Sequence, residues 1–334
     1  MARSLVSWRR SSRIVFVTQL KKWPATNVAI RRMGTPARPC SWNKAGRAGV
    51  PILQMQEDNQ SMKDLRGRNA IVTGTSAGLG VFVARALARE GMNVVLAARS
   101  IEALEQVAAE MRGFGVKAIA VQTDVSDEVQ LQRLVERSMS EFGSIDVLVN
   151  NAGIEAFCRF DEISPADIRR TIDVNLLATL LLTRYVIPHM KQAGRGHIIN
   201  MSSISGKQGP PFASVYGASK AGMIAFTQSL RSEYHGLGIS ASAICPGFAT
   251  DGGIYEELRQ KTGKSVPWYV GGTSSEAVAR AVVKAIKSDR ADLIVNSPTL
   301  RGLFTLCSLF PRIGESIYRI ASRKYLERVA DRHK

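Results

Sequence analysis

From Asp64 onward, short runs of apolar residues alternate with longer stretches in which apolar residues recur at a helical period. Most of the short runs are apolar on both faces, which is typical of strands in a parallel sheet that helices cover on both sides. Seven runs are predicted to be strands, at 69–74, 93–99, 117–125, 145–153, 196–203, 239–247 and 292–297.

The stretches between these runs are amphipathic and long enough for helices. They are expected near 78–91, 101–113, 126–142, 164–192, 214–235 and 274–288. Strands that alternate with crossover helices predict an α/β fold, a Rossmann-like doubly wound parallel sheet of about seven strands with helices on both faces. No linker or internal repeat interrupts residues 61–297, so this part is predicted to be one domain, between a basic segment at 1–60 and an amphipathic helical extension at 298–334.

The positive charge is concentrated at the N-terminal end. Of the formal net charge of +17, residues 1–56 supply +11, because they hold eight Arg, three Lys and no acid, and the other 278 residues carry only +6. A basic folded face would favour nucleic acid as a partner, but this charge lies outside the expected domain, so no nucleic-acid partner is predicted. An acid-free segment rich in Arg and Ser is typical of a mitochondrial or chloroplast transit peptide.

Two alternatives remain for this segment. The true start of the chain could be Met55 or Met62, which would place the protein in the cytoplasm, or the segment could be a basic disordered arm. No run approaches the ~18–20 apolar residues of a membrane span, and the longest, 174–187, contains Arg184. The four cysteines stand far apart and the four histidines lack ligand spacing, so neither a metal site nor a disulfide framework is expected.

The first expected strand ends in TGTSAGLG, residues 73–80, and a helical pattern follows directly. Gly74, Gly78 and Gly80 would let the backbone approach a pyrophosphate, which the free N–H groups of the helix N-terminus would bind. A flexible turn is the alternative. The position directly after the first strand favours a dinucleotide.

The end of the second strand indicates which dinucleotide binds. The sequence there is LAARS, and Arg99 stands where an acid would bind the ribose 2′-hydroxyl of NAD. Because a guanidinium suits a 2′-phosphate, NADP (NADPH) is expected rather than NAD, unless Arg99 only ends a strand that faces solvent. After the third strand, Asp124 is placed to bond the adenine ring or to cap the next helix, for which Ser126 is also available.

The stretch SVYGASKAG, residues 214–222, begins a helical pattern and places Tyr216 and Lys220 on one face, one turn apart. A free tyrosine has a pKa of about 10, too high for acid–base work at neutral pH, and a nearby ammonium lowers it. Lys220 is therefore expected to tune Tyr216 as an acid. A chance pair at a helix start is the alternative.

Together these motifs resemble the short-chain dehydrogenase/reductase family, in its order and at its spacing, over about 64–297. The matching motifs are TGTSAGLG (73–80), TDV (123–125), NNAG (150–153), DVN ending in Asn175, SS ending in Ser203, YGASK (216–220) and PG (246–247). The resemblance implies a catalytic tetrad of Asn175, Ser203, Tyr216 and Lys220. Ser203 would hold the substrate oxygen, Lys220 would reach the nicotinamide ribose, and Asn175 would hold a water that links Lys220 to solvent.

The resemblance also implies a set of cofactor contacts at the phosphate loop, the strand ends and the catalytic helix. These are Thr73, Gly74, Ser76, Gly78, Leu79, Gly80, Arg99, Asp124, Val125, Asn151, Ala152, Gly153, Tyr216, Lys220, Pro246, Gly247 and Thr250. NNAG would support the sheet behind the cofactor, with Asn150 near the adenosine side. Thr250 comes one place earlier than in the commoner family pattern.

The expected function is that of an NADP(H)-dependent oxidoreductase that moves hydride between nicotinamide and a ketone or secondary alcohol. A non-catalytic NADP-binding or regulatory protein on the same fold is the alternative. Substrate contacts are expected from 154–160, 204–212 and a lid at 251–272, where Lys207 could meet an acidic group or stay exposed. The aromatic residues of these segments favour an apolar or acyl substrate or pack in the core; they are Phe157, Phe212, Phe248, Tyr255, Trp268 and Tyr269.

Two further features concern partners. The helices near 164–192 and 214–235 carry more apolar positions than one sheet face would cover, which predicts a homodimer or homotetramer, or else one long buried helix. In the C-terminal extension, apolar residues are followed by a basic amphipathic stretch, which could make peripheral membrane contact, cap the pocket or pack on a partner subunit. The apolar residues are Leu303, Phe304, Leu306, Leu309 and Phe310.

Overall fold

The computed structural model describes residues 62–155, 157–249, 251 and 271–330. The chain divides into two compact units, and all of these residues belong to the second, Met55–Lys334. Of the predicted site residues, Thr250 lies outside the described residues, as do Tyr255, Trp268, Tyr269 and most of the predicted lid.

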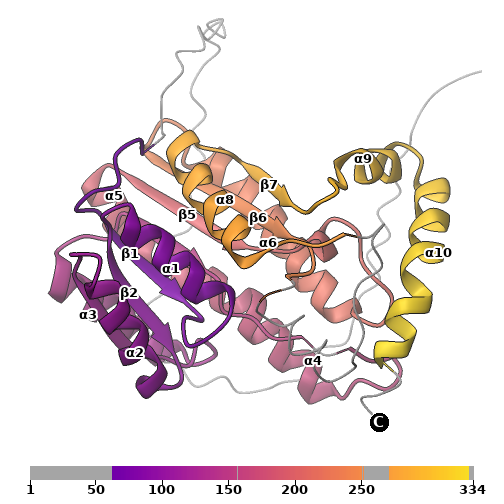
Figure 1. The fold of residues 1–334 in the computed structure, drawn as a ribbon, viewed down its shortest axis with the longest axis horizontal. Coiled ribbons are helices and arrows are strands. Elements are labelled where there is room, and N and C mark those ends of the chain that lie inside the picture. The colour runs from indigo at the N-terminus through magenta and orange to yellow at the C-terminus, as the bar shows by residue number, and fades with distance from the viewer. Residues whose placement is uncertain (1–61, 156, 250, 252–270, 331–334) are drawn as a thin grey trace, which may run out of the picture. The chain divides into compact units, whose positions relative to one another are not determined.

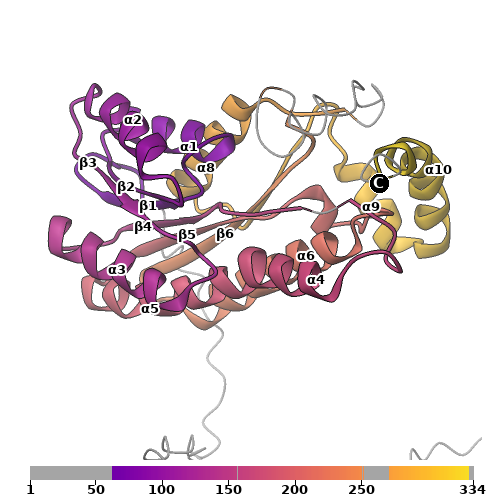
Figure 2. The ribbon, with the colours of Figure 1, turned by 90° about the horizontal axis from the view of Figure 1, so that it is seen from below.

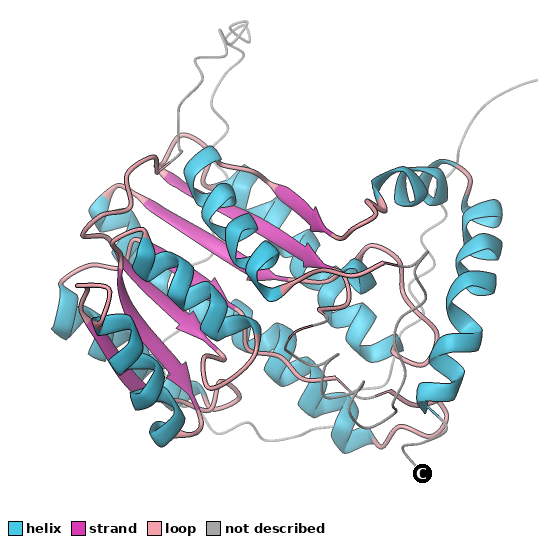
Figure 3. Cartoon of the chain, viewed as in Figure 1, coloured by secondary structure: helices cyan, strands magenta, loops and turns pink. Residues whose placement is uncertain are grey.

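The seven predicted strands are confirmed and form one sheet in which every pairing is parallel (Figures 1 and 3). The strands are β1 (Asn69–Thr73), β2 (Asn93–Ala98), β3 (Ala118–Gln122), β4 (Val147–Asn150), β5 (Gly196–Met201), β6 (Ile239–Pro246) and β7 (Asp292–Val295). They lie in the order β3-β2-β1-β4-β5-β6-β7, so the chain changes direction across the sheet between β1 and β4. In open α/β sheets, ligands bind at such a switch point, beyond the carboxyl ends of the strands.

The predicted helices are confirmed, except that the one expected near 164–192 is interrupted, and they cover both faces of the sheet (Figure 2). They are α1 (Leu79–Arg89), α2 (Ile101–Arg112), α3 (Glu128–Phe142), α4 (Pro165–Ile172), α5 (Ala178–Ala193), α6 (Ser214–Glu233) and α8 (Ser275–Ser288), with α9 (Arg301–Leu309) and α10 (Pro311–Ala330) in the extension. Figure 2 shows α1, α2 and α8 on one face and α3, α4, α5 and α6 on the other. Local sequence sets the helix starts, since the Ser100, Asp127, Ser164 and Ser274 side chains each accept a backbone N–H at an N-cap.

Most of the strands are apolar on both faces because each face of the sheet carries its own core. On β1, Val72 packs on the side of α1 with Leu87, whereas its neighbour Ile71 packs on the other side with Leu182 of α5. All four side chains are almost completely buried. This two-sided burial accounts for the near-continuous apolar runs in the sequence.

The run Pro165–Ala193 differs from the expected single helix. It contains one turn of π-helix, Asp173–Leu177, between α4 and α5. Contrary to the expectation from the sequence, this run is long and apolar enough to cross a membrane by length and composition alone. In the fold it serves as a core helix, because Leu182, Val186 and Met190 are buried against the sheet.

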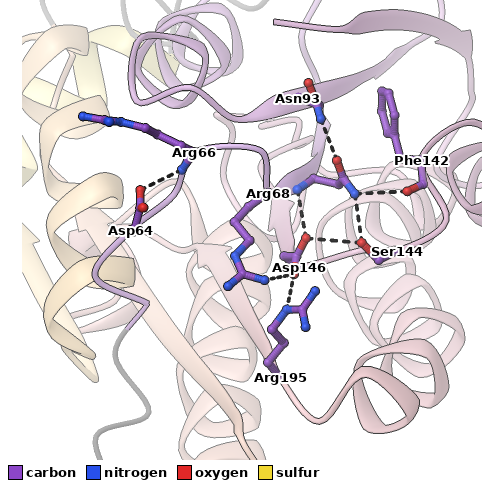
Figure 4. Close-up of polar contacts among 9 residues, drawn as sticks. Asp64, Arg66, Arg68, Asn93, Phe142, Ser144, Asp146 and Arg195 are labelled. Carbon is purple, nitrogen blue, oxygen red and sulfur yellow. Dashed lines mark hydrogen bonds and ion pairs between the residues drawn. The ribbon is translucent and has the colours of Figure 1, made fainter.

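Polar contacts join the strands at the amino ends of β1, β2, β4 and β5 (Figure 4). The buried carboxylate of Asp146 accepts the backbone N–H of Asn69 at 3.0 Å, the Arg195 Nε–H at 2.6 Å and an Arg68 Nη1–H at 3.4 Å. The Asn69 Oδ1 in turn accepts a hydrogen bond from Asn93 Nδ2 at 2.9 Å. Asp146 therefore joins the segments where β1, β4 and β5 begin, and Asn69 extends this network to β2.

Candidate active site

The phosphate loop lies at the carboxyl end of β1, next to β4. Gly74 has a φ of +71°, and a Cβ there would come within 2.9 Å of the Ala152 Cα, so the loop requires glycine. A Cβ at Gly80 would collide with the Gly74 carbonyl oxygen. Gly78 caps α1 without a side-chain hydrogen bond, and the first turn holds no acid, so its N–H groups and positive dipole suit an anion.

The loop also contains a buried polar group that fits a cofactor. The Thr75 hydroxyl has no hydrogen-bond partner among the described residues, although the residue is completely buried. An unpaired buried hydroxyl is costly, and a bound phosphate or ribose oxygen would satisfy it. Together with the glycine backbone, this group shows that the residues present fit a dinucleotide.

Asn151 braces the loop from β4. The Thr73 Oγ1 accepts the backbone N–H groups of Asn151 and Ala152, both at 3.0 Å. The Asn151 Nδ2 donates to the carbonyl oxygens of Thr73 at 2.8 Å and Gly74 at 3.2 Å. Asn150, predicted near the adenosine side, points to the other face of the sheet.

Asn150 lies in the interior, where its Nδ2 donates to Asn200 Oδ1 at 2.9 Å and to Thr183 Oγ1 at 3.1 Å. Successive strand residues point to opposite faces, which is why Asn150 and Asn151 have different roles. Pro246 ends β6, and a Cβ at the next residue, Gly247, would collide with the end of the Asn296 side chain, which would then have to move.

On the adenosine side, Arg99 is exposed directly after β2. Asp124 lies nearby, and its Oδ1 accepts Ser126 N–H at 2.9 Å and the Ser126 hydroxyl at 2.6 Å. These hydrogen bonds, with a contribution from Arg99, lower the pKa of the Asp124 carboxyl group. The two alternatives of Asp124 or Ser126 as the cap of the next helix are wrong: the N-cap of α3 is Asp127, which accepts the N–H groups of Val129 and Gln130.

Tyr216 and Lys220 share one face of α6, as predicted, and Lys220 Nζ lies 5.6 Å from the centre of the Tyr216 ring. Both side chains are buried. Ser203 follows β5, its Oγ accepts the Ser205 N–H at 3.1 Å, and it shares a hydrogen bond with Tyr216. The fold therefore brings the serine, tyrosine and lysine together beyond the carboxyl ends of β4 and β5.

Asn175, the fourth tetrad residue, lies in the π-helical turn and is completely buried. Its Oδ1 accepts the Ile154 N–H at 2.8 Å, and its Nδ2 donates to the Ile154 carbonyl oxygen at 2.9 Å and to Ser219 Oγ at 3.2 Å. A π-helical turn often marks a functional site, and here it aims Asn175 at the segment after β4. The water relay implied for Asn175 stays a prediction.

The Lys220 ammonium is held among few polar groups. Its Nζ donates to the Met201 carbonyl oxygen at 2.8 Å, and a Cβ at Gly153 would lie 3.5 Å from it. Burial lowers the pKa of Lys220 to about 8, while Glu155 and the Cys245 thiol oppose this shift. Lys220 can therefore change its charge near neutral pH.

The pKa of Tyr216 contradicts the expectation from the sequence. Burial raises it, Glu155 raises it further, and the hydrogen bond with Ser203 acts in the opposite direction. The protein groups therefore keep the phenol protonated and make it a weaker acid than a free tyrosine. The positive nicotinamide ring of an oxidised cofactor would favour the phenolate.

Two charged residues have roles that the sequence did not reveal. Glu155 is partly buried, and burial raises the pKa of its carboxyl group to about 8, while Lys220 opposes this shift. The available signal was an acid directly after NNAGI in an otherwise apolar stretch. Lys207, for which an exposed position was one expectation, is instead paired with Asp292 at the start of β7.

Of the aromatic residues predicted for the substrate pocket, the structure describes Phe157, Phe212 and Phe248. Phe157 is buried, and the adjacent Cys158 N–H donates to the Phe212 carbonyl oxygen at 2.9 Å, which joins the two predicted substrate segments. Phe212 has a φ of +65°, an uncommon conformation for a bulky residue. Phe248 is partly buried at the end of β6.

Residues 68–263 match the family model described as short chain dehydrogenase. The chain is 41% identical over 263 residues to the ketoacyl reductase HetN of Nostoc sp., which covers 77% of this chain and 90% of that protein. Among solved structures it is similar to an actinorhodin polyketide ketoreductase with NADPH (30% identity, TM-score 0.64, 69% of this chain and 95% of that one). It is also similar to a short chain dehydrogenase/reductase from Burkholderia phymatum in complex with NAD (27% identity, TM-score 0.67, 75% and 96%).

Proposed function

Because the chain belongs to the short-chain dehydrogenase/reductase family and is a nicotinamide-dependent oxidoreductase, we propose that it uses NADPH to reduce a ketone on an apolar or acyl substrate. The observation that carries this proposal is the meeting of Ser203, Tyr216 and Lys220 beside a loop that fits a dinucleotide. A protein that only binds NADP has no need of a buried tyrosine–lysine pair.

The protein supplies the proton and holds the oxygen, while the nicotinamide supplies the hydride when bound. Ser203 donates a hydrogen bond to the substrate carbonyl oxygen, and Tyr216 gives that oxygen its proton as negative charge develops. Lys220 stabilises the phenolate that remains. In the oxidation direction the same phenolate would take the proton from the alcohol.

The preference for NADPH rests on Arg99. Its guanidinium is exposed at the tip of β2, where an NAD-specific protein would carry an acid. A planar guanidinium binds a phosphate through two parallel hydrogen bonds.

The substrate proposal rests on the aromatic residues of the predicted pocket and on the similar proteins. Phe157, Phe212 and Phe248 supply apolar surface at the carboxyl edge. Two of the similar proteins are described as a ketoacyl reductase and a polyketide ketoreductase, which points to a 3-oxoacyl thioester.

The direct test is NADPH oxidation by the full chain against 3-oxoacyl thioesters, lipid ketones, sugars and quinones. Turnover of a 3-oxoacyl thioester would support the proposal. Tight NADPH binding without turnover of any carbonyl would favour the non-catalytic alternative.

We also propose a homodimer or homotetramer, which light scattering would test, and an organelle location set by residues 1–60, which a fluorescent fusion of those residues would test.

Peripheral membrane contact is proposed through α9 and α10. Five large apolar side chains are exposed there: Leu309 (68%), Phe310 (54%), Ile313 (54%), Ile317 (41%) and Ile320 (78%). Basic amphipathic helices bind anionic lipid surfaces, so co-sedimentation with vesicles containing phosphatidylserine is expected, and equal recovery with phosphatidylcholine alone would contradict an electrostatic role.

A further inference from the structure

The turn between β5 and α6 lies directly against the backbone of Lys220. It is the 3₁₀ turn Ile204–Gly206, which follows Ser203. A Cβ at Gly206 would come within 2.7 Å of both the carbonyl carbon and the carbonyl oxygen of Lys220. The turn therefore rests on the catalytic helix with no space for a side chain between them.

Hydrogen bonds join the start of the same segment to Lys220. The Met201 carbonyl oxygen accepts the Lys220 Nζ–H at 2.8 Å, and the Ser202 hydroxyl donates to the Lys220 carbonyl oxygen at 2.8 Å. Ser203, which holds the substrate oxygen in the proposed reaction, comes next in the chain, and its carbonyl oxygen accepts the Gly206 N–H at 3.0 Å. The position of Ser203 relative to Lys220 is therefore set by this segment as one unit.

Lys207, the residue after this turn, anchors it to β7. Its Nζ donates to Asp292 Oδ2 at the start of that strand. The other carboxylate oxygen, Oδ1, lies 3.6 Å from Cys245 Sγ, a weak donor on the neighbouring strand β6. Asp292 therefore connects the turn to both β6 and β7.

The ion pair is shielded from much of the solvent. The side chain of Lys207 is 18% exposed and that of Asp292 is 37% exposed, whereas both side chains of the Arg112–Glu105 pair are about half-exposed. A fully exposed ion pair contributes little, but a partly buried one loses more when one partner is removed. A change at either partner is therefore expected to release the turn from β7.

We propose that Lys207 and Asp292 are positioning residues: their ion pair holds the turn after β5 against α6. Through that turn the pair keeps Ser203 and Lys220 in their relative places around the substrate oxygen. This consequence for catalysis rests on the proposed function. The phosphate loop is braced separately by Asn151, so the affinity for the cofactor is expected not to depend on the ion pair.

The first test is NADPH-dependent reduction of acetoacetyl-coenzyme A, a 3-oxoacyl thioester, by the full chain. In Lys207→Met, which removes the charge and keeps a long side chain, kcat is expected to fall about tenfold, because a misplacement of about 1 Å can cost up to 10²-fold. The dissociation constant of NADPH, measured by calorimetry, is expected to stay unchanged. Lys207→Arg keeps the cation and should retain most of the activity. Asp292→Asn should match Lys207→Met, and the double variant should be no slower than either single one.

Lys287→Met is the matched control. It breaks a comparably exposed ion pair, between Lys287 and Glu90, which joins the C-terminal ends of α8 and α1. It should lower the melting temperature about as much as Lys207→Met and leave kcat unchanged. An unchanged kcat in Lys207→Met, or a loss of the same size in Lys287→Met, would overturn the proposal.

The second test does not depend on activity. It is ¹³C NMR of the full chain labelled at lysine Cε, with the Lys220 resonance assigned by its disappearance in Lys220→Arg. Because Lys220 Nζ donates to the Met201 carbonyl oxygen, displacement of the segment should shift this resonance in Lys207→Met and in Asp292→Asn, but not in Lys287→Met. An unshifted Lys220 resonance in Lys207→Met would overturn the proposal. Absence of any turnover by the wild type would contradict the proposed function, while the NMR spectra would still decide whether the ion pair positions the turn.

Discussion

Two charged side chains are buried at opposite ends of the same parallel strands, and they differ in how completely they are paired. At the amino ends, Asp146 accepts hydrogen bonds from two arginines and a backbone N–H. At the carboxyl ends, the Lys220 ammonium donates to one carbonyl oxygen and contacts the Met223 sulfur at 3.6 Å. A charge with permanent partners stabilises the fold, whereas an incompletely paired one can titrate and take part in chemistry.

The largest expected effect comes from the carboxyl edge. Tyr216→Phe removes one hydroxyl group and with it the proton donor, so kcat for carbonyl reduction should fall by about 10³-fold. The fold and the dissociation constant of NADPH should change little, because the phenylalanine ring fills the same space. Steady-state kinetics, calorimetric binding and thermal melts of the two proteins measure these three quantities. A tenfold or smaller loss of kcat would mean that Tyr216 is not the donor.

The opposite pattern is expected at the amino edge. Asp146→Ala removes the acceptor that joins the strand starts, so the free energy of unfolding should decrease by about 2 kcal/mol, while kcat of the folded enzyme stays unchanged. Glu105→Ala is the matched control, because its ion pair with Arg112 is half-exposed and should contribute less than about 1 kcal/mol. Urea denaturation measures both. Equal losses of unfolding free energy in Asp146→Ala and Glu105→Ala would show that the buried carboxylate contributes no more than an exposed ion pair.

The free energy of unfolding, measured as a function of pH, gives a second test at the amino edge. His197 of β5 is completely buried, its Nε2 lies 2.8 Å from Ser242 Oγ, and burial lowers its pKa to about 4, assisted by Arg231 and opposed by Asp289. In the unfolded chain its pKa is about 6.5, so the unfolded state binds the extra proton first as the pH falls. The stability contributed by neutral His197 is complete above pH 6.5 and is lost progressively toward pH 4.

His197→Gln removes this titration and keeps a hydrogen-bonding group. Urea midpoints measured between pH 7 and pH 4 should therefore decline less steeply in the variant than in the wild type. Parallel declines would show that other groups account for the acid sensitivity.

The smallest expected effect concerns an exposed charge at the carboxyl edge. Arg99→Ala should lower the preference for NADPH over NADH by about tenfold in kcat/KM, since an exposed guanidinium–phosphate pair contributes about 1–2 kcal/mol. Thermal stability should not change. An unaltered ratio of the two cofactors would reject Arg99 as the residue that selects the 2′-phosphate.

Local pattern predicted much of this molecule. The seven strands were predictable because most of them are apolar on both faces, and the Tyr216–Lys220 pair because helical spacing is a local property. The direction of the Tyr216 pKa shift was not predictable, because it depends on burial and on Glu155, sixty-one positions earlier in the chain. The π-helical turn and the pairing of Lys207 with Asp292 also depend on packing between elements distant in sequence.

The central claim is that the carboxyl edge of the sheet is a reductase site whose proton comes from Tyr216. The most direct measurement is NADPH oxidation by the full chain with a 3-oxoacyl thioester, carried out beside Tyr216→Phe. We predict turnover by the wild type that falls about 10³-fold in the variant while NADPH binding is retained. Turnover of equal rate in both proteins would contradict the account.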